Sequence, residues 1–278
     1  GGDVFTLRRL RLLGLVLHAL RRRGAWLVFV SEHLRALARE TAPELAPWLD
    51  EAIVQPMGID LARFAAIARA PSAPPTVLVV ARLVPIKGVD VAIAAMRHVR
   101  SPARLVIAGD GPERPRLEEL ARNAMTTDAG LVIAGDDTER AHLDARARAQ
   151  IASARVASAE RAVHAPPLFL GEVTTVQRDE LLRTAGVVVV PSRVLPSGRV
   201  EGAPLLALEA LAAGVPVIAS AVGGLVELPG VHCIAPDEPR ELARAIGQIL
   251  ASPPSPESLR AAVAALDWRA VAPRLLRA

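Results

Sequence analysis

The strongest constraint on the fold is a series of short apolar segments that recurs between residues 76 and 235. The segments are 76–81, 104–109, 131–135, 168–171, 187–191, 215–220 and 231–235. Strands that are apolar along their whole length are typical of sheets covered on both faces. Helical stretches separate most of the segments, and this alternation indicates βαβ units and a parallel sheet. The pattern predicts an α/β fold with a Rossmann-like domain that starts at residue 76.

The residues before this series predict smaller elements and a connector. The apolar run 25–30 predicts a buried strand, and Ser31 is placed to cap a helix that follows it. Residues 53–60 predict a short strand that ends in a turn. The proline-rich stretch 68–75 is the best candidate for a linker, so we expect the boundary between two units within residues 61–75.

Residues 5–24 combine leucines at near-helical spacing with arginines on both flanks. A signal peptide is a poor fit, because arginines follow the short apolar stretch and no small-residue cleavage site is evident. Two interpretations stay open. The segment is either an amphipathic helix packed on a sheet, or a basic helix that contacts anionic lipid and brings the protein to the inner face of the membrane.

Composition excludes several classes of protein. Hydrophobic residues make up 51% of the chain, but no apolar run reaches the roughly 18 residues that a spanning helix needs. The single cysteine, Cys233, excludes a disulfide framework and a cysteine-based zinc site, and it fits a cytoplasmic location. The net charge is only +4 and aromatic residues make up 3%, so the chain offers few stacking platforms for single-stranded nucleic acid.

The most informative string is 199–227, which contains Glu201 and Glu209. Pro204 fits the first position of a helix over residues 204–213, and the free N–H groups of that helix would form an anion site suited to phosphate. Gly202 is small enough to let a ligand approach the backbone. Both carboxylates could accept hydrogen bonds from sugar hydroxyls. The alternative is one surface glutamate and one helix-face glutamate with no shared role.

Two basic residues follow the segment 76–81 and are expected at the same edge of the sheet. Arg82 offers a planar fork for phosphate oxygens, and Lys87 offers a compact charge. Lys87 is the only lysine in a chain that otherwise uses arginine, which favours a specific role over a random surface charge.

Weaker signals follow other segments. Gly109 permits a tight backbone approach, but Arg114 stands where the dinucleotide fingerprint requires a third glycine. Residues 169–173 could offer backbone groups to a nucleobase, and neither a P-loop nor a convincing pair of metal-binding carboxylates is present. The strings 105–122 and 131–148 resemble each other at an offset of 26 residues, which reflects either a local duplication or chance.

Five strings occur in a fixed order: ARLVPIKGVD (81–90), LVIAGDGPE (105–113), FLGEV (169–173), VVVVPS (187–192) and EGAPLLALEALAAGVPVIAS (201–220). Together they resemble the carboxyl-terminal half of family 4 of the retaining glycosyltransferases, which have the GT-B fold. The resemblance implies a donor-binding domain over residues 76–265 and a last helix over 266–278. It also implies that residues 1–60 hold the last βα units of an incomplete amino-terminal acceptor domain.

The resemblance implies a role for each matching residue. Arg82 and Lys87 would hold the donor diphosphate and stabilise the leaving group. Glu201 would contact the transferred sugar near its anomeric centre, and Glu209 would bind the ribose. The remaining positions expected to contact the donor are Gly202, Ala203, Leu205, Leu206, Gly109 and, near the base, Val173.

The resemblance also implies an activity: retaining, metal-independent transfer of a hexose from a nucleotide-diphosphate sugar to a glycan or lipid acceptor, without a cofactor. Two departures limit it. The histidine of the family string H-G-G-D would fall immediately before Gly1, and residues 123–167 are longer than the family usually needs. The alternatives are a nucleotide-sugar-binding fragment or split subunit that is inactive alone, whose acceptor domain is absent or on a partner chain, and an epimerase or phosphorylase of the same fold.

Overall fold

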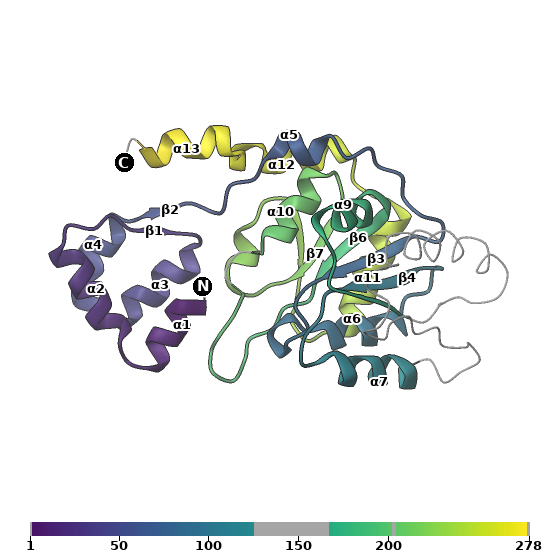
Figure 1. The fold of residues 1–278 in the computed structure, drawn as a ribbon, viewed down its shortest axis with the longest axis horizontal. Helices are drawn as coiled ribbons and strands as arrows, with labels where there is room; N and C mark the ends of the chain where they lie inside the picture. The colour runs from purple at the N-terminus through teal and green to yellow at the C-terminus, as the bar shows by residue number, and fades with distance from the viewer. Residues whose placement is uncertain (1, 125–166, 202–203, 277–278) are drawn as a thin grey trace.

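The computed structural model describes residues 2–124, 167–201 and 204–276. These residues form a small amino-terminal unit, residues 2–60, and an α/β domain that begins at residue 76 (Figure 1). Across the described ranges, no helix has both the length and the apolar character needed to cross a membrane.

The α/β domain is built on a six-stranded sheet with the order β5-β4-β3-β6-β7-β8, and every neighbouring pair is parallel. The strands are β3 (Thr76–Val80), β4 (Arg104–Ala108), β5 (Leu168–Gly171), β6 (Ala185–Val190), β7 (Val217–Ser220) and β8 (Val231–Ile234). The predicted parallel α/β fold is therefore confirmed. The segment 131–135, which also predicts a strand, lies outside the described residues.

Helices cover both faces of this sheet (Figure 1), which explains why its central strands β3 and β6 are almost entirely apolar. The edge strand β8 instead carries the exposed residues His232 and Cys233. One face carries α6 (Val89–Met96), α7 (Arg114–Ala124) and α11 (Pro239–Ala251). The other carries α5 (Leu61–Ala65), α9 (Thr175–Thr184), α10 (Leu205–Ala212) and α12 (Pro256–Val263). Successive residues of β3 alternate between the two cores, with Val77 and Val79 in the first and Leu78 in the second.

The amino-terminal unit is mostly helical. Its helices are α1 (Gly2–Arg9), α2 (Leu13–Arg22), α3 (Glu32–Thr41) and α4 (Ala46–Asp50), with a 3-10 turn, η1 (Pro43–Leu45), before α4. Its two short strands, β1 (Val28–Phe29) and β2 (Ile53–Val54), pair in parallel. Ser31 caps α3 as expected, because its Oγ accepts a hydrogen bond from the Leu34 N–H at 3.3 Å.

Two expectations for this unit are wrong in part. The run 25–30 predicts a buried strand, but only Val28–Phe29 is a strand, and Val28 is 49% exposed. Among the described residues, β1 pairs only with β2, and Phe29 packs against the helical clusters of the unit whereas Val28 does not join them. Residues 5–24 form two helices instead of one, because Arg11 has a positive φ of 57° between α1 and α2.

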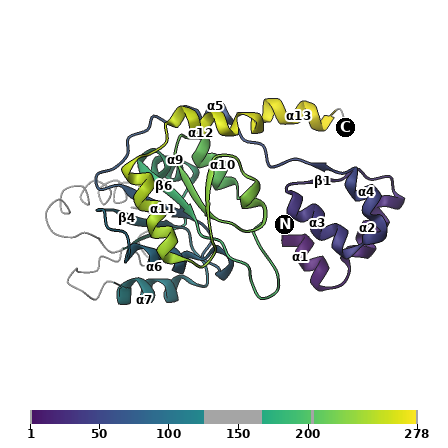
Figure 2. The same cartoon turned by 180° about the vertical axis from the view of Figure 1, so that it is seen from behind.

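The segment expected to be a linker, residues 61–75, begins with a helix. α5 (Leu61–Ala65) packs on α10, and its Phe64 is buried in the core beneath that face of the sheet. Residues 264–276, which form η5 (Ala264–Leu266) and α13 (Trp268–Leu276), return to the segment just before α5. α13 runs from α12 toward the side of the amino-terminal unit, as the view from behind shows (Figure 2).

Candidate functional site

A cavity of about 300 Å³ opens at the carboxyl ends of β3 and β6, the two central strands of the sheet. The chain runs outward from β3 through β4 to β5 and then returns to β6 on the other side of β3. A parallel sheet binds ligands in the crevice that this reversal of strand order leaves. Residues 79–81, 189–192 and 204–206 line the cavity, and Lys87 and Glu201 are the charged residues among its described lining.

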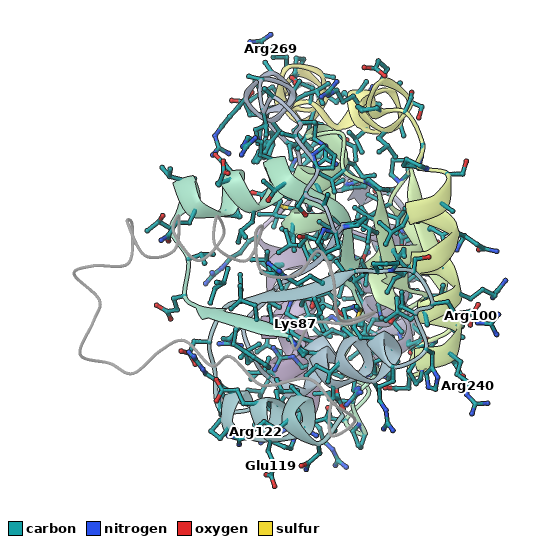
Figure 3. All side chains as sticks on the ribbon, turned by 90° about the vertical axis from the view of Figure 1, so that its right-hand side faces the viewer. Lys87, Arg100, Glu119, Arg122, Arg240 and Arg269 are labelled. Carbon is teal, nitrogen blue, oxygen red and sulfur yellow. The ribbon has the colours of Figure 1, made fainter. Side chains whose placement is uncertain are left out.

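Lys87 and Glu201 form an ion pair in this cavity. Nζ of Lys87 lies 2.6 Å from Oε2 of Glu201, and the two side chains are only 23% and 17% exposed. Because burial removes much of the hydration of both charges, each depends on the other for compensation. Exposed arginines differ from Lys87: Arg100, Arg240 and Arg269 project from the outline of the molecule, whereas Lys87 does not (Figure 3).

The turn after Lys87 explains why its side chain reaches the cavity. Lys87 ends the 3-10 helix η2 (Pro85–Lys87), and Gly88 follows with a φ of 58°. A Cβ atom on Gly88 would overlap the carbonyl oxygen of Pro191, so the turn lies directly against the backbone at the end of β6. The Arg193 N–H also donates to the carbonyl of Ile86 at 3.0 Å. The turn is thus held in place by the backbone that follows β6.

The start of α10 borders the same cavity. Pro204 is the N-cap and α10 begins at Leu205, so the predicted helix over 204–213 is present and one residue shorter at each end. Leu205 and Leu206 line the cavity, while Ala207 and Leu208 are buried against the sheet and fix the axis of the helix. A helix start carries unpaired N–H groups and a partial positive charge, so this edge of the cavity favours an anion.

Ser192 is a site residue that the sequence analysis missed. It lines the cavity, its exposure is 0%, and within the described part of the chain its Oγ has no hydrogen-bond partner. A buried hydroxyl without a partner costs about 1–3 kcal/mol, so such a group is expected where a ligand can supply the bond. Its position immediately after the strand run 187–191 was the available signal, since ligands bind at strand ends.

Glu209 lies on α10 and is paired with an arginine. Its Oε2 is 3.0 Å from Nη1 of Arg178 on α9, and its side chain is 13% exposed. Burial raises the pKa of Glu209, and the positive charge of Arg178 opposes that rise without cancelling it. Arg178 also lies over the ring of Phe64, 5.8 Å from its centroid. Nothing in the sequence separates Arg178 from the many other arginines.

The structure places the other predicted residues differently. Arg82 is exposed and is not among the residues that line the cavity. Gly109 faces the chain itself, because a Cβ there would overlap the carbonyl of Ala81. Val173 is half-buried against the core on the α10 side of the sheet. Leu205 and Leu206 line the cavity, whereas Gly202 and Ala203 lie outside the described residues.

Within the described ranges, no group of three or more His, Cys, Asp or Glu side chains is placed to hold a metal ion. Among the described residues that line the cavity, the charged side chains are one cationic and one anionic, Lys87 and Glu201, beside a helix start.

Comparison with protein families identifies the domain that contains the cavity. Two models with the description "Glycosyl transferases group 1" match residues 63–130 and residues 121–252. Residues 63–252 belong to the glycosyl transferases group 1 family. The group 1 domain thus includes the sheet, the Lys87–Glu201 pair and the start of α10.

Curated relatives of the chain are glycosyltransferases. It is 34% identical over 266 residues to a glycogen synthase of Mycobacterium tuberculosis (strain H37Rv). That alignment covers 89% of this chain and 54% of the relative. It is 33% identical over 199 residues to a D-inositol 3-phosphate glycosyltransferase of Acidothermus cellulolyticus. That alignment covers 68% of this chain and 36% of the relative. The chain therefore spans about half the length of the first of these relatives, and less of the second.

Solved structures share the fold of the chain. Anabaena HepE in complex with UDP and glucose aligns with a TM-score of 0.63 at 16% identity, over 96% of this chain and 66% of HepE. AviGT4, a glycosyltransferase of avilamycin A biosynthesis, aligns with a TM-score of 0.58 at 23% identity, over 90% of this chain and 61% of AviGT4. The group 1 domain therefore has the α/β architecture of GT-B glycosyltransferases.

Proposed function

We propose that this chain carries the donor site of a retaining, metal-independent glycosyltransferase that moves a sugar from a nucleotide-diphosphate sugar to a glycan or lipid acceptor. The observation that carries the proposal is the Lys87–Glu201 pair in the cavity at the start of α10. A diphosphate would lie between the Lys87 ammonium and the N–H groups of α10, and both favour negative charge. The GT-B relatives in complexes with UDP support a nucleotide sugar as the ligand.

Departure of a nucleoside diphosphate concentrates negative charge on its terminal phosphate. A fixed cation and a helix start stabilise that charge in the transition state more than in the ground state, which lowers the barrier. Lys87 would supply the charge that a divalent metal supplies in other enzymes. Neutralisation by side chains is the reason that we expect a chelator to leave donor binding unchanged.

Binding of the donor would exchange the partners of two ion pairs. The diphosphate would replace Glu201 as the partner of Lys87, and Glu201 would then accept a hydrogen bond from a hydroxyl of the sugar. In the same way, the ribose hydroxyls would share Glu209 with Arg178. Each carboxylate thus faces a hydroxyl, and each phosphate oxygen faces a cation or an N–H group.

The chain would bind the donor without transferring it if the acceptor-binding residues lie elsewhere. The extent of the match supports this second candidate, since the chain covers 54% of its glycogen synthase relative. The two candidates share one donor site. They differ in whether the chain alone releases nucleoside diphosphate from a nucleotide sugar.

Contact with a membrane surface is a further part of the proposal. The exposed side chains Leu10, Leu12 and Leu15 lie beside the exposed arginines Arg9 and Arg11 in α1, α2 and the turn between them. Apolar and basic groups together favour an anionic bilayer surface. Pelleting with anionic vesicles, and no pelleting with zwitterionic ones, is the expected result.

Calorimetry with UDP, GDP and ADP tests the donor site. For the nucleoside diphosphate that binds, we expect Lys87→Ala to weaken the affinity about 10- to 100-fold, as the loss of a charge-assisted hydrogen bond does. Glu201→Gln should leave that affinity unchanged or improve it, because it frees Lys87. Arg100→Ala, which removes an exposed cation, is the control. Equal losses for Lys87→Ala and Arg100→Ala would contradict a specific role for Lys87.

A further inference from the structure

A carboxylate of the group 1 domain binds the start of a helix in the amino-terminal unit. Glu227 is the last residue of the 3-10 helix η4 (Gly223–Glu227), which follows β7. Its Oε2 accepts a hydrogen bond from the Glu32 N–H at 2.7 Å, and its Oε1 accepts one from the His33 N–H at 3.0 Å. We name these two hydrogen bonds the Glu227–α3 contact.

The start of α3 is suited to such a carboxylate. The first N–H groups of a helix have no partner within the helix and carry a partial positive charge. Ser31 Oγ accepts the hydrogen bond from Leu34 N–H, so Glu227 takes the two N–H groups that Ser31 leaves. The contact joins residues 194 and 195 positions apart in the sequence, and it fixes α3 against η4.

The opposite end of η4 holds Glu201. A Cβ on Gly223 would overlap the carbonyl oxygen of Glu201, and the Gly224 N–H donates to that same oxygen at 3.4 Å. The residue before Glu201 is held by the amino-terminal unit itself. Val200 is only 6% exposed and packs in one cluster with Phe5 of α1 and with Leu34 and Leu37 of α3.

Glu201 therefore differs from the other charged groups of the donor site. Lys87 is fixed by a turn against β6, and Glu209 is fixed by α10 and by Arg178 of α9, all within the group 1 domain. The backbone of Glu201 instead lies between η4 and a cluster that includes α1 and α3.

From this arrangement we propose that Glu227 is a positioning residue: its contact with α3 sets the place of Glu201, so that the amino-terminal unit controls the sugar end of the donor site while the diphosphate end is independent of it. The proposal rests on the proposed function, because it assigns the sugar to Glu201. It predicts that breaking the contact reduces the extra affinity that the sugar adds and spares the affinity for the nucleoside diphosphate.

The contact can be weakened from the amino-terminal side without altering the group 1 domain. Glu32 is the first residue of α3, a position at which proline is tolerated, and Ser31 before it is extended, as a residue before proline prefers. Glu32→Pro removes the N–H that donates to Glu227 Oε2, and it leaves the hydrogen bond from His33 N–H to Oε1. Glu32→Ala is the matched control, since it keeps that N–H and loses only the side-chain pair with Arg35.

Glu227→Ala breaks the contact from the other side. Its control is Glu119→Ala on α7, an exposed glutamate that projects from the lower edge of the molecule (Figure 3). Unfolding by urea shows whether each variant folds. Amide exchange over residues 195–201 shows, without any ligand, whether the segment before Glu201 is released.

The readout is the ratio of two affinities: UDP against UDP-glucose, GDP against GDP-mannose, and ADP against ADP-glucose. We expect Glu32→Pro and Glu227→Ala to lower the affinity that the sugar adds about tenfold, as the weakening of a hydrogen bond to a charged group does, and to speed amide exchange over 195–201. Affinity for the nucleoside diphosphate should change less than about twofold, far below the loss of a charged hydrogen bond. Both control variants should match the wild type.

Two results would overturn the inference in different ways. If the wild type binds a nucleoside diphosphate and Glu32→Pro equals Glu32→Ala in both affinities and in exchange, the positioning role is wrong and the donor site stands. If the wild type binds none of the nucleotides, the proposed function fails and the inference fails with it.

Discussion

Two buried serines of this protein differ in their hydrogen bonds. Ser31 caps α3 through a hydrogen bond from Leu34 N–H, whereas Ser192 in the cavity has no partner among the residues that the structure describes. Their exposed fractions are 1% and 0%, so burial does not distinguish them. The difference predicts opposite effects of the same substitution on stability.

We expect Ser31→Ala to lower the free energy of unfolding by about 1 kcal/mol, the usual cost of a lost N-cap. Ser192→Ala should leave it unchanged or raise it by up to about 1 kcal/mol, because it removes a polar group that lacks a hydrogen bond. Urea unfolding of both variants without ligand is the measurement. A clear loss of stability in Ser192→Ala would mean that its hydroxyl has a structural partner.

At the scale of elements, α10 combines a helix start at the cavity with a buried carboxyl one turn later. Burial raises the pKa of Glu209, and this effect exceeds the opposing attraction of Arg178. Such a carboxyl binds its proton more tightly in the folded protein than in the unfolded chain. Stability therefore falls as the pH rises from the unfolded value, near 4.5, through the higher pKa of the folded state.

Glu209→Gln tests this dependence. The variant cannot titrate at position 209, so the stability of the wild type relative to the variant should fall as the pH rises from 4 toward 7, which is the direction set by a raised pKa. Urea unfolding at a series of pH values gives the comparison, and Glu119→Gln controls for the loss of a surface charge. A wild-type stability that rises relative to Glu209→Gln would mean that the attraction of Arg178 dominates.

The elements that the sequence predicts well are those whose burial is uniform. The central strands β3 and β6 lie between two layers of helices and, apart from Thr76 at the start of β3, carry no polar side chain, so the apolar run itself marks the strand. β1 was expected as a longer buried strand because Trp26 and Val28 are apolar, yet they are 77% and 49% exposed. Exposed apolar residues give the same local sequence pattern as buried ones.

Site residues could be predicted from the sequence where their residue type or local setting is distinctive, and not where many similar residues occur along the chain. Lys87 stands out as a single lysine, and Glu201 stands before a helix start with a recognisable proline. Arg178 and Glu227 act through partners that lie far away in the sequence: Glu209 for the first and the start of α3 for the second. Both pairings join residues of separate elements, and the one between Glu227 and α3 also depends on how the two units meet. No local sequence pattern encodes such contacts.

At the scale of the whole molecule, the end of the chain fastens the connection between its two parts. Residues near 267 lie beside the segment that leads from the amino-terminal unit into α5, through hydrogen bonds from Ile59 N–H to the carbonyl of Leu266 and from Trp268 N–H to the carbonyl of Ile59, at 2.9 and 3.0 Å. Gly58 has no room for a Cβ because the ring of Trp268 covers it. The path of the connection is therefore set by residues at the opposite end of the sequence.

Asp267 is the side chain on which this junction depends most. Its Oδ2 accepts a hydrogen bond from Leu61 N–H at 3.2 Å, at the start of α5, and its Oδ1 accepts one from Arg269 N–H at 2.7 Å, at the start of α13. Asp267→Ala removes both and should lower the free energy of unfolding by about 2 kcal/mol, the sum of two lost caps. Asp60→Ala removes a single hydrogen bond, the one that Arg63 N–H donates, and should lower the free energy of unfolding by about 1 kcal/mol.

Proteolysis is the second measurement. Asp267→Ala should increase cleavage within residues 55–75 more than Asp60→Ala does. If the two variants are equal in both measurements, the end of the chain does not fasten the connection, and α5 is held by its packing on α10 alone.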